Sequence, residues 1–269
     1  IAMLKKIITG TFAILSILSL NAQTDSTAKP SGPVISGSVD GYYRYNFADV
    51  PGKLNNYTSF TNSQNSFELG MATIKVDHSI GKVSATIDLG FGRRAQEFSY
   101  NDANTMLAIK QMYLSYALTD KIKLTAGKWA THVGYEVLDA TGNRNYSMSY
   151  GFSYGPFFHT GVRADVTSGK SGFMVGVSNP TDFKYVPSGV LNKKFLIAQY
   201  SYAASDNLKL YLKYVGGQNI DTSKSSQFDL VLTSKFSSVF SLAFNGTINN
   251  TKLWENGKSA SAKSWWGSA

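Results

Sequence analysis

Three histidines occur in the chain, and two of them flank one glycine- and tyrosine-rich stretch. If the stretch between His132 and His159 folds as a loop, the two imidazoles meet at its base. Such a pair is suited to metal ligation or acid–base chemistry. Histidines held in a protein wall are the commoner arrangement. The chain has no cysteine to supply thiolate ligands or disulfides. We therefore predict no metal, no cofactor and no catalytic residue.

Two further patterns resemble catalytic or cofactor motifs. Ser147 or Ser149, with His132 and Asn145, contains the residue types of a barrel hydrolase, but no spacing supports that chemistry. The run Gly90–Arg94 contains a GxG, for which we expect no following helix and find no acidic partner about 20 residues on. We interpret it as a strand end entering a loop.

Charged side chains form the more informative group of candidates. We expect ten of them on the polar face of strands and two, Glu136 and Arg144, in the loop between the histidines. Rings of charge set ion preference in pores. The predicted pore-lining and constriction residues are Asp40, Arg44, Glu68, Asp88, Glu136, Arg144, Arg163, Asp165, Lys209, Lys213, Asp229 and Lys235.

The net charge bears on which ions such a pore would prefer. The formal charge of +9 falls to +7 once Lys5 and Lys6 leave with the signal peptide proposed below, which favours a mild anion preference. The alternative is a wall of mutually balancing charges without selectivity. No run of basic residues exceeds two, so we expect no nucleic-acid partner.

These side chains depend on strands for their positions, because apolar and polar residues alternate along most of the chain. From Ile35 to Phe47 the odd positions carry most of the bulky groups, and Val83–Phe91, Leu208–Tyr214 and Phe240–Asn249 alternate in the same way. Period-2 patterning indicates strands with one apolar and one polar face. In the run 66–80 the apolar phase shifts after Met71, which predicts a β-bulge.

About a dozen such strands, roughly 9–13 residues long, match transmembrane strands better than the shorter strands of soluble proteins. Tight joints alternate with joints expected to be long, at 48–65, 93–105, 132–156, 180–193, 217–226 and 251–262. Short turns on one side and long loops on the other are typical of outer-membrane barrels. The predicted fold is all-β, a transmembrane antiparallel up-and-down barrel of about 12 strands.

The first residues predict export. Lys5 and Lys6 precede a short apolar run, Ile7–Leu20, that is too short to span a bilayer. We predict a signal peptide over 1–23, a polar linker over 24–34 and the barrel over 35–269. The chain stops a few residues into the strand that we expect from Lys263, so we expect it to be truncated at its C-terminus.

The stretch Lys128–Arg163 resembles a known family. It contains Gly127-Lys128-Trp129, Thr131-His132-Val133-Gly134-Tyr135-Glu136-Val137 and His159-Thr160-Gly161-Val162-Arg163, and the opening strand contains Gly41-Tyr42-Tyr43-Arg44-Tyr45-Asn46-Phe47. Together they resemble the OmpL-like β-barrel porin family of Gram-negative outer membranes, from about Gly41 to the end. The resemblance implies a porin-like channel of undefined substrate.

The stretch 132–156 is also expected to be one long loop, and loops of that length are usually functional or disordered. One hypothesis folds it inward as a constriction, with Glu136 and Arg144 at the narrowest point. The other leaves it as an external loop.

The favoured function is a passive outer-membrane channel for small hydrophilic solutes and ions. The alternatives are a non-conducting barrel that acts as an adhesin or scaffold through its loops and, less favoured, a barrel hydrolase. The expected partners are outer-membrane lipid, small solutes and the barrel-assembly machinery, and the sequence leaves the oligomeric state open.

Overall fold

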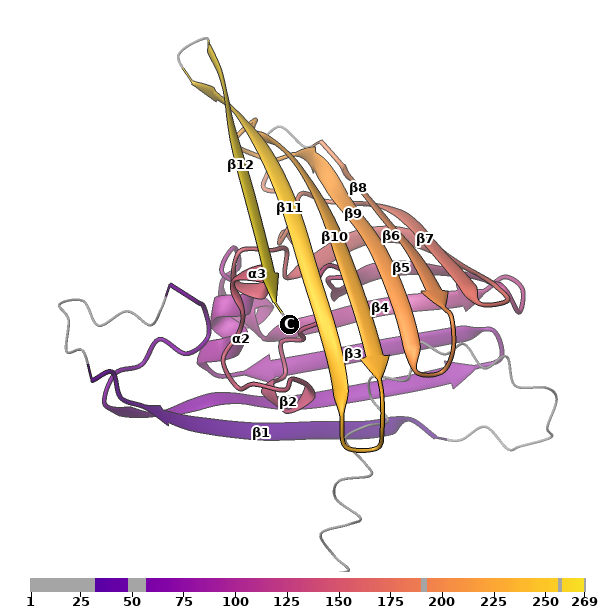
Figure 1. The fold of residues 1–269 in the computed structure, drawn as a ribbon, viewed down its shortest axis with the longest axis horizontal. Coiled ribbons are helices and arrows are strands. Elements are labelled where there is room, and N and C mark those ends of the chain that lie inside the picture. The colour runs from indigo at the N-terminus through magenta and orange to yellow at the C-terminus, as the bar shows by residue number, and fades with distance from the viewer. Residues whose placement is uncertain (1–31, 48–56, 190–192, 256–257, 269) are drawn as a thin grey trace, which may run out of the picture.

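The alternating segments form strands that pair strictly in sequence order. The structure is a computed structural model that describes residues 32–47, 57–189, 193–255 and 258–268. Within these ranges twelve antiparallel strands form one sheet, ordered β1 to β12 (Figure 1). Their bounds are β1 Val34–Arg44, β2 Ser66–Ile80, β3 Val83–Phe91, β4 Ile109–Ala117, β5 Ile122–Ala130, β6 Phe158–Ser168, β7 Ser171–Ser178, β8 Phe195–Ala203, β9 Leu208–Gln218, β10 Lys224–Lys235, β11 Ser241–Glu255 and β12 Lys258–Ser268. The predicted signal segment 1–23 and most of the linker lie outside the described residues.

The two faces of the sheet have the polarity of a membrane barrel. The concave face buries polar side chains, among them Thr86, Asp229 and Asn245. The outer face exposes apolar ones, such as Val162 and Ile248. Because a soluble barrel buries its apolar face instead, this inversion is the arrangement expected where lipid surrounds the sheet.

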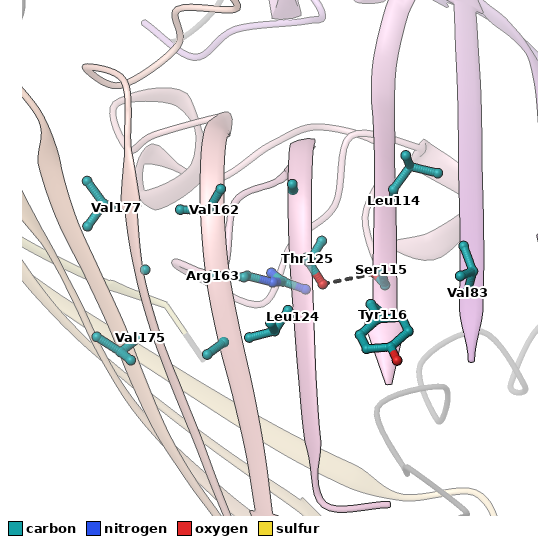
Figure 2. Close-up of a pocket in the computed structure, with 13 residues that line it drawn as sticks. Val83, Leu114, Ser115, Tyr116, Leu124, Thr125, Val162, Arg163, Val175 and Val177 are labelled. Carbon is teal, nitrogen blue, oxygen red and sulfur yellow. Dashed lines mark hydrogen bonds between the residues drawn. The ribbon is translucent and has the colours of Figure 1, made fainter. Parts of the chain in front are cut away.

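Figure 2 shows part of this outer face, across β3 to β7. Leu114, Leu124, Val162 and Val175 line a shallow groove of about 740 Å³. Ser115 and Thr125 alternate with these apolar residues and hydrogen-bond to each other across β4 and β5, 2.9 Å apart. Neighbouring strands are therefore aligned so that each keeps its apolar residues on the outer side.

The predicted alternation of tight and long joints is confirmed for nine of the eleven joints and wrong for two, those between β9 and β10 and between β11 and β12. The joints at 45–65, 92–108, 131–157 and 179–194 are long, and those between β2–β3, β4–β5, β6–β7, β8–β9 and β10–β11 are short. However, β9 and β10 extend to leave only 219–223 between them, and β11 and β12 leave only 256–257. The polar residues there pair in the ladder, so polarity alone was a poor sign of a loop.

The bulge predicted near Met71 is confirmed. Asp40 pairs with Met71 and Gly41 with Leu69, so Gly70 is the extra residue of β2. The Asp40 carboxylate accepts a hydrogen bond from the Met71 N–H at this point. The bulge restores the apolar phase, because Phe67 and Leu69 on one side of it and Ile74 on the other are all exposed.

Short helices occur in the long joints. They are α2 (Arg93–Phe98), η1 (Asn104–Ala108), η2 (Ala140–Gly142) and α3 (Tyr150–Ser153). The expectation that no helix follows the GxG run was wrong: α2 begins directly after Gly92 and buries Arg94, Ala95 and Phe98. Contacts of α2 with β2 and β3, and of α3 with β11 and β12, place both inside the curve of the sheet (Figure 1).

No helix in the described part of the chain is long and apolar enough to span a membrane.

The sheet curves but does not close. Strands β1 and β12 each have a neighbour on one side only, and they do not pair with each other within the described residues. The concave space between them holds the segment that follows β5 (Figure 1).

Candidate functional site: a loop seated on the concave wall

The segment 131–157, here called the inner loop, crosses the concave face of the sheet. At its base the Gly134 N–H donates to Asp229 Oδ1 on β10 at 3.0 Å, and the Gly134 carbonyl accepts from Lys213 Nζ on β9. His132 Nε2 lies 3.0 Å from the Tyr214 carbonyl. The inner loop therefore folds inward, as one of the two hypotheses predicted.

Two cations from the opposite side hold the middle of the inner loop. The guanidinium of Arg94 on α2 donates to the carbonyls of Leu138 and Tyr146, at 3.2 and 3.4 Å, and stacks 4.8 Å from the Tyr146 ring centroid. Lys110, where β4 begins, contacts Asp139 at 2.7 Å. Because each attachment bridges residues distant in sequence, the loop is part of the wall's packing.

The far end of the inner loop reaches the last strands and the first joint. Arg144 donates to the Ser241 hydroxyl on β11. The Tyr154 hydroxyl donates to the Tyr57 carbonyl at 2.7 Å. The loop thus contacts both ends of the curved sheet.

The two predicted constriction residues, Glu136 and Arg144, have different partners. Glu136 accepts hydrogen bonds from the backbone N–H and hydroxyl of Ser149, inside the loop, whereas Arg144 extends to β11. Glu136 thereby orders the turn before α3, where the Ser149 hydroxyl also caps Phe152. The Ser149 hydroxyl, considered with His132 and Asn145 for hydrolysis, thus donates to a carboxylate in the structure.

The charged residues predicted for the strands lie largely on the concave side, and most have a partner of opposite charge. Asp88 contacts Lys110 at 3.1 Å, Arg163 contacts Asp165 at 3.3 Å, and Lys213 contacts Asp229 at 3.7 Å. The remaining predicted residues lie as follows: Glu68 contacts Arg93, Asp40 lies 3.9 Å from Arg94, Arg44 donates to the Ser63 carbonyl, Lys209 lines a cavity near the β6–β7 and β8–β9 turns, and Lys235 is exposed at the end of β10.

Charge pairing weakens the electrostatic field that this wall exerts on the concave space. Asp229 is almost fully buried and also accepts from Gly134, Asn245 and Thr247, so its charge is engaged. Paired charges project little field into the space beside them. These ion pairs are what the balanced-wall alternative requires, and the mild anion preference inferred from net charge stays a prediction.

Sequence reasoning missed two apolar clusters on the polar side of the sheet. One joins side chains of three long joints with the wall: Phe60, Met71, Ala95, Phe98, Leu138, Met148, Phe152, Phe157 and Phe158. The other sits at the base of the inner loop: Trp129, Val133, Met174, Phe195, Ile197 and Val215. Several of these residues lie at strand ends, where they interrupt the alternation of apolar and polar residues. That interruption was the only sequence signal of the clusters. Together they anchor the loop by burial as well as by hydrogen bonds.

A buried carboxylate connects the outer loops to the start of β6. Asp182 accepts hydrogen bonds from the N–H groups of Phe157 and Phe158, at 2.7 and 3.0 Å, and from the Tyr100 hydroxyl at 3.0 Å. Burial raises the pKa of Asp182 to about 6, against those three hydrogen bonds, which lower it. No local sequence pattern indicates this connection, because Asp182 and Tyr100 belong to different joints.

The histidines meet as the sequence predicted, at the base of the inner loop. The ring centroids of His132 and His159 lie 5.1 Å apart. Among the described residues, no group of three or more histidine, cysteine, aspartate or glutamate side chains is arranged to hold a metal ion. Each ring has a hydrogen-bonding neighbour at Nε2: the Tyr214 carbonyl for His132 and the Thr131 hydroxyl for His159.

Comparison with known proteins agrees with this architecture. No curated protein matches the chain. A sequence model of the family described as "Putative beta-barrel porin-2, OmpL-like" matches residues 34–269, which include all twelve strands and the inner loop. The chain therefore belongs to the OmpL-like β-barrel porin family.

Proposed function

We propose that the protein is an outer-membrane channel for small hydrophilic solutes and ions, narrowed by the inner loop. The observation that carries the proposal is a loop held on the polar concave face of a sheet whose outer face is apolar. Membership of a porin family supports the same placement. Export by the segment 1–23 and insertion by the barrel-assembly machinery belong to this proposal.

Lipid imposes one further requirement on the sheet. Every backbone N–H and C=O in the hydrocarbon region needs a partner, so the free edges of β1 and β12 must be paired in the membrane. We propose that this pairing completes the wall around the inner loop.

The channel predicts a specific effect of the inner loop on conductance. Deleting 134–151 from the protein refolded in detergent and inserted in planar bilayers should raise the single-channel conductance, because the loop then no longer crosses the lumen. Replacing the five residues 219–223 by a two-residue turn is the matched control, since that joint lies outside the loop's described contacts. Unchanged conductance in the deletion, with a folded barrel, would contradict the constriction.

A non-conducting scaffold is the second candidate, and the packing of the loop favours it. Most of the predicted concave charges are paired, and two apolar clusters hold the loop against the wall. A folded barrel that stays silent in salt, both intact and with 134–151 removed, would decide for the scaffold.

A further inference from the structure

At the base of the inner loop, His132 and His159 each have a hydrogen-bond partner at only one of their two ring nitrogens among the described residues. His132 Nε2 donates to the Tyr214 carbonyl. His159 Nε2 lies 3.2 Å from the Thr131 hydroxyl, which itself accepts from the Val133 N–H and so has its proton free for the ring. Neither Nδ1 has a partner among the described residues. Each ring therefore has a second nitrogen facing surroundings that cannot solvate it.

Among the residues that the structure describes, the carboxylates near the pair already have cationic partners. Lys213 of β9 and Arg163 of β6 approach the rings, and their partners are Asp229 of β10 and Asp165 of β6. Asp229 is further engaged by Gly134, Asn245 and Thr247. Tyr113 of β4 packs against the apolar cluster beside the rings.

Protonation of either ring would add an uncompensated charge at this place. Burial lowers the pKa of His132 to about 4, with the Lys213 and Arg163 charges adding to that effect and the Tyr214 hydrogen bond opposing it. The seated loop thus favours neutral histidine. A loop lifted from the wall would return His132 to water, where an imidazole binds a proton near pH 6.5.

We propose that His132 and His159 form an acid-sensitive latch that releases the base of the inner loop from β9 and β10. Proton uptake places two cations 5.1 Å apart, beside Lys213 and Arg163, whose carboxylate partners Asp229 and Asp165 are already paired. The loop base then leaves the wall, and Gly134 gives up its bonds to Asp229 and Lys213. The latch goes beyond the proposed channel and does not require conduction.

A buried cysteine reports this motion directly, because the natural chain contains none. Val133 is 5% exposed, next to His132, so Val133→Cys is shielded while the loop is seated. Its reaction with 4,4′-dithiodipyridine is followed between pH 7.5 and 4 in the folded full-length protein, normalised to Ser238→Cys in the exposed β10–β11 turn. The normalised rate should rise on acidification, by up to about tenfold per pH unit for one titrating site.

Histidine variants assign the response. His132→Gln keeps a donor for Tyr214 but cannot be protonated, so the acid response should disappear or fall to the part carried by His159; His159→Gln should also weaken it. His78→Gln is the matched control, because His78 lies on β2 away from the loop, and should respond like the parent. If His132→Gln does not fold, judged by heat-modifiable migration, His132→Asn replaces it.

Two outcomes would overturn the latch: a folded parent whose labelling does not change with pH, or an acid response that survives in the double variant H132Q/H159Q. Failure of the proposed channel function is distinguished by measuring conductance separately from labelling. A barrel that labels with the expected pH dependence but never conducts would contradict the proposed function and leave the latch standing.

Discussion

At the scale of single residues, Asp182 shows how one buried charge organises the outer loops. Its carboxylate gathers two backbone N–H groups and the Tyr100 hydroxyl, and it is nearly inaccessible to water. Asp182 also has a positive φ of 63°, a conformation that asparagine and aspartate tolerate better than other side-chain residues. The position therefore depends on two properties of aspartate: its capacity to accept several hydrogen bonds and its tolerance of a positive φ.

The raised pKa of Asp182 predicts a pH dependence with a definite sign. Because its folded-state pKa of about 6 exceeds the ordinary value of 3.8, its stabilising contribution is complete below pH 3.8 and is lost as pH rises through 6. Lowering the pH from 7.5 to 5 should strengthen local protection by about 1 kcal/mol through this group. Hydrogen-exchange protection of the Phe157 and Phe158 amides, corrected for intrinsic rates, measures it.

Asparagine and alanine variants serve as the controls. Asp182→Asn keeps an acceptor and should remove the pH dependence with protection retained, whereas Asp182→Ala should lose protection at all pH values. A pH dependence that persists in Asp182→Asn would assign the effect to another group.

At the scale of elements, the bulge in β2 and helix α2 together receive the inner loop. A Cβ on Gly70 would lie 2.3 Å from Asp40 Oδ1 and 2.6 Å from the Tyr146 hydroxyl, so the glycine leaves space for the loop's tyrosine. Arg94 meets the same tyrosine from α2, and its side chain is fully buried. The surfaces of the wall and of the inner loop are therefore complementary around Tyr146.

Removing the Arg94 side chain should loosen the inner loop more than any change at its surface. Arg94→Ala leaves the Leu138 and Tyr146 carbonyls without their donor and Asp40 without a neighbouring cation, at a cost of about 3–5 kcal/mol typical of a broken buried charge contact. Limited proteolysis should then cut within 134–151. Arg93→Ala is the control, since Arg93 is the exposed neighbour on α2; equal cleavage in both variants would refute the clamp.

At the scale of the whole molecule, the inverted polarity of the sheet decides what surrounds it. Exposed aliphatic and aromatic side chains cover the outer face along all the strands from β1 to β11, while charges gather inside in pairs. In water such a surface would promote association. In lipid the apolar outer face is energetically favourable, and the ion pairs on the concave face do not contact the lipid.

This polarity predicts unequal costs for the same charge on the two faces. Val162→Arg, on the outer face, should destabilise the barrel folded in lipid vesicles by about 2–4 kcal/mol if it lies near the bilayer midplane. Ser201→Arg, in the concave cavity beside Lys209, should cost much less because water reaches it. Denaturant unfolding in vesicles measures both. Equal, small effects would indicate that the outer face does not meet lipid.

The strands, their faces and the bulge could be predicted from the sequence alone, because each of these follows from a period of two residues and from turn-forming joints. The same local reasoning failed where polar residues continue a strand, as in β9 to β12, since a ladder can pair polar side chains as readily as apolar ones. It also placed the two histidines at the base of one loop, where the structure has them.

The path of that loop and the pairing of the charges depend on the three-dimensional fold. Gly134 and Asp229 are 95 residues apart, Arg144 and Ser241 are 97 apart, and Arg94 meets the Tyr146 carbonyl across 52 residues. No local pattern encodes such contacts, because they depend on how the sheet curves to bring distant strands around one segment. The sequence could name Glu136 and Arg144 as charged loop residues, but the fold directed them to different partners.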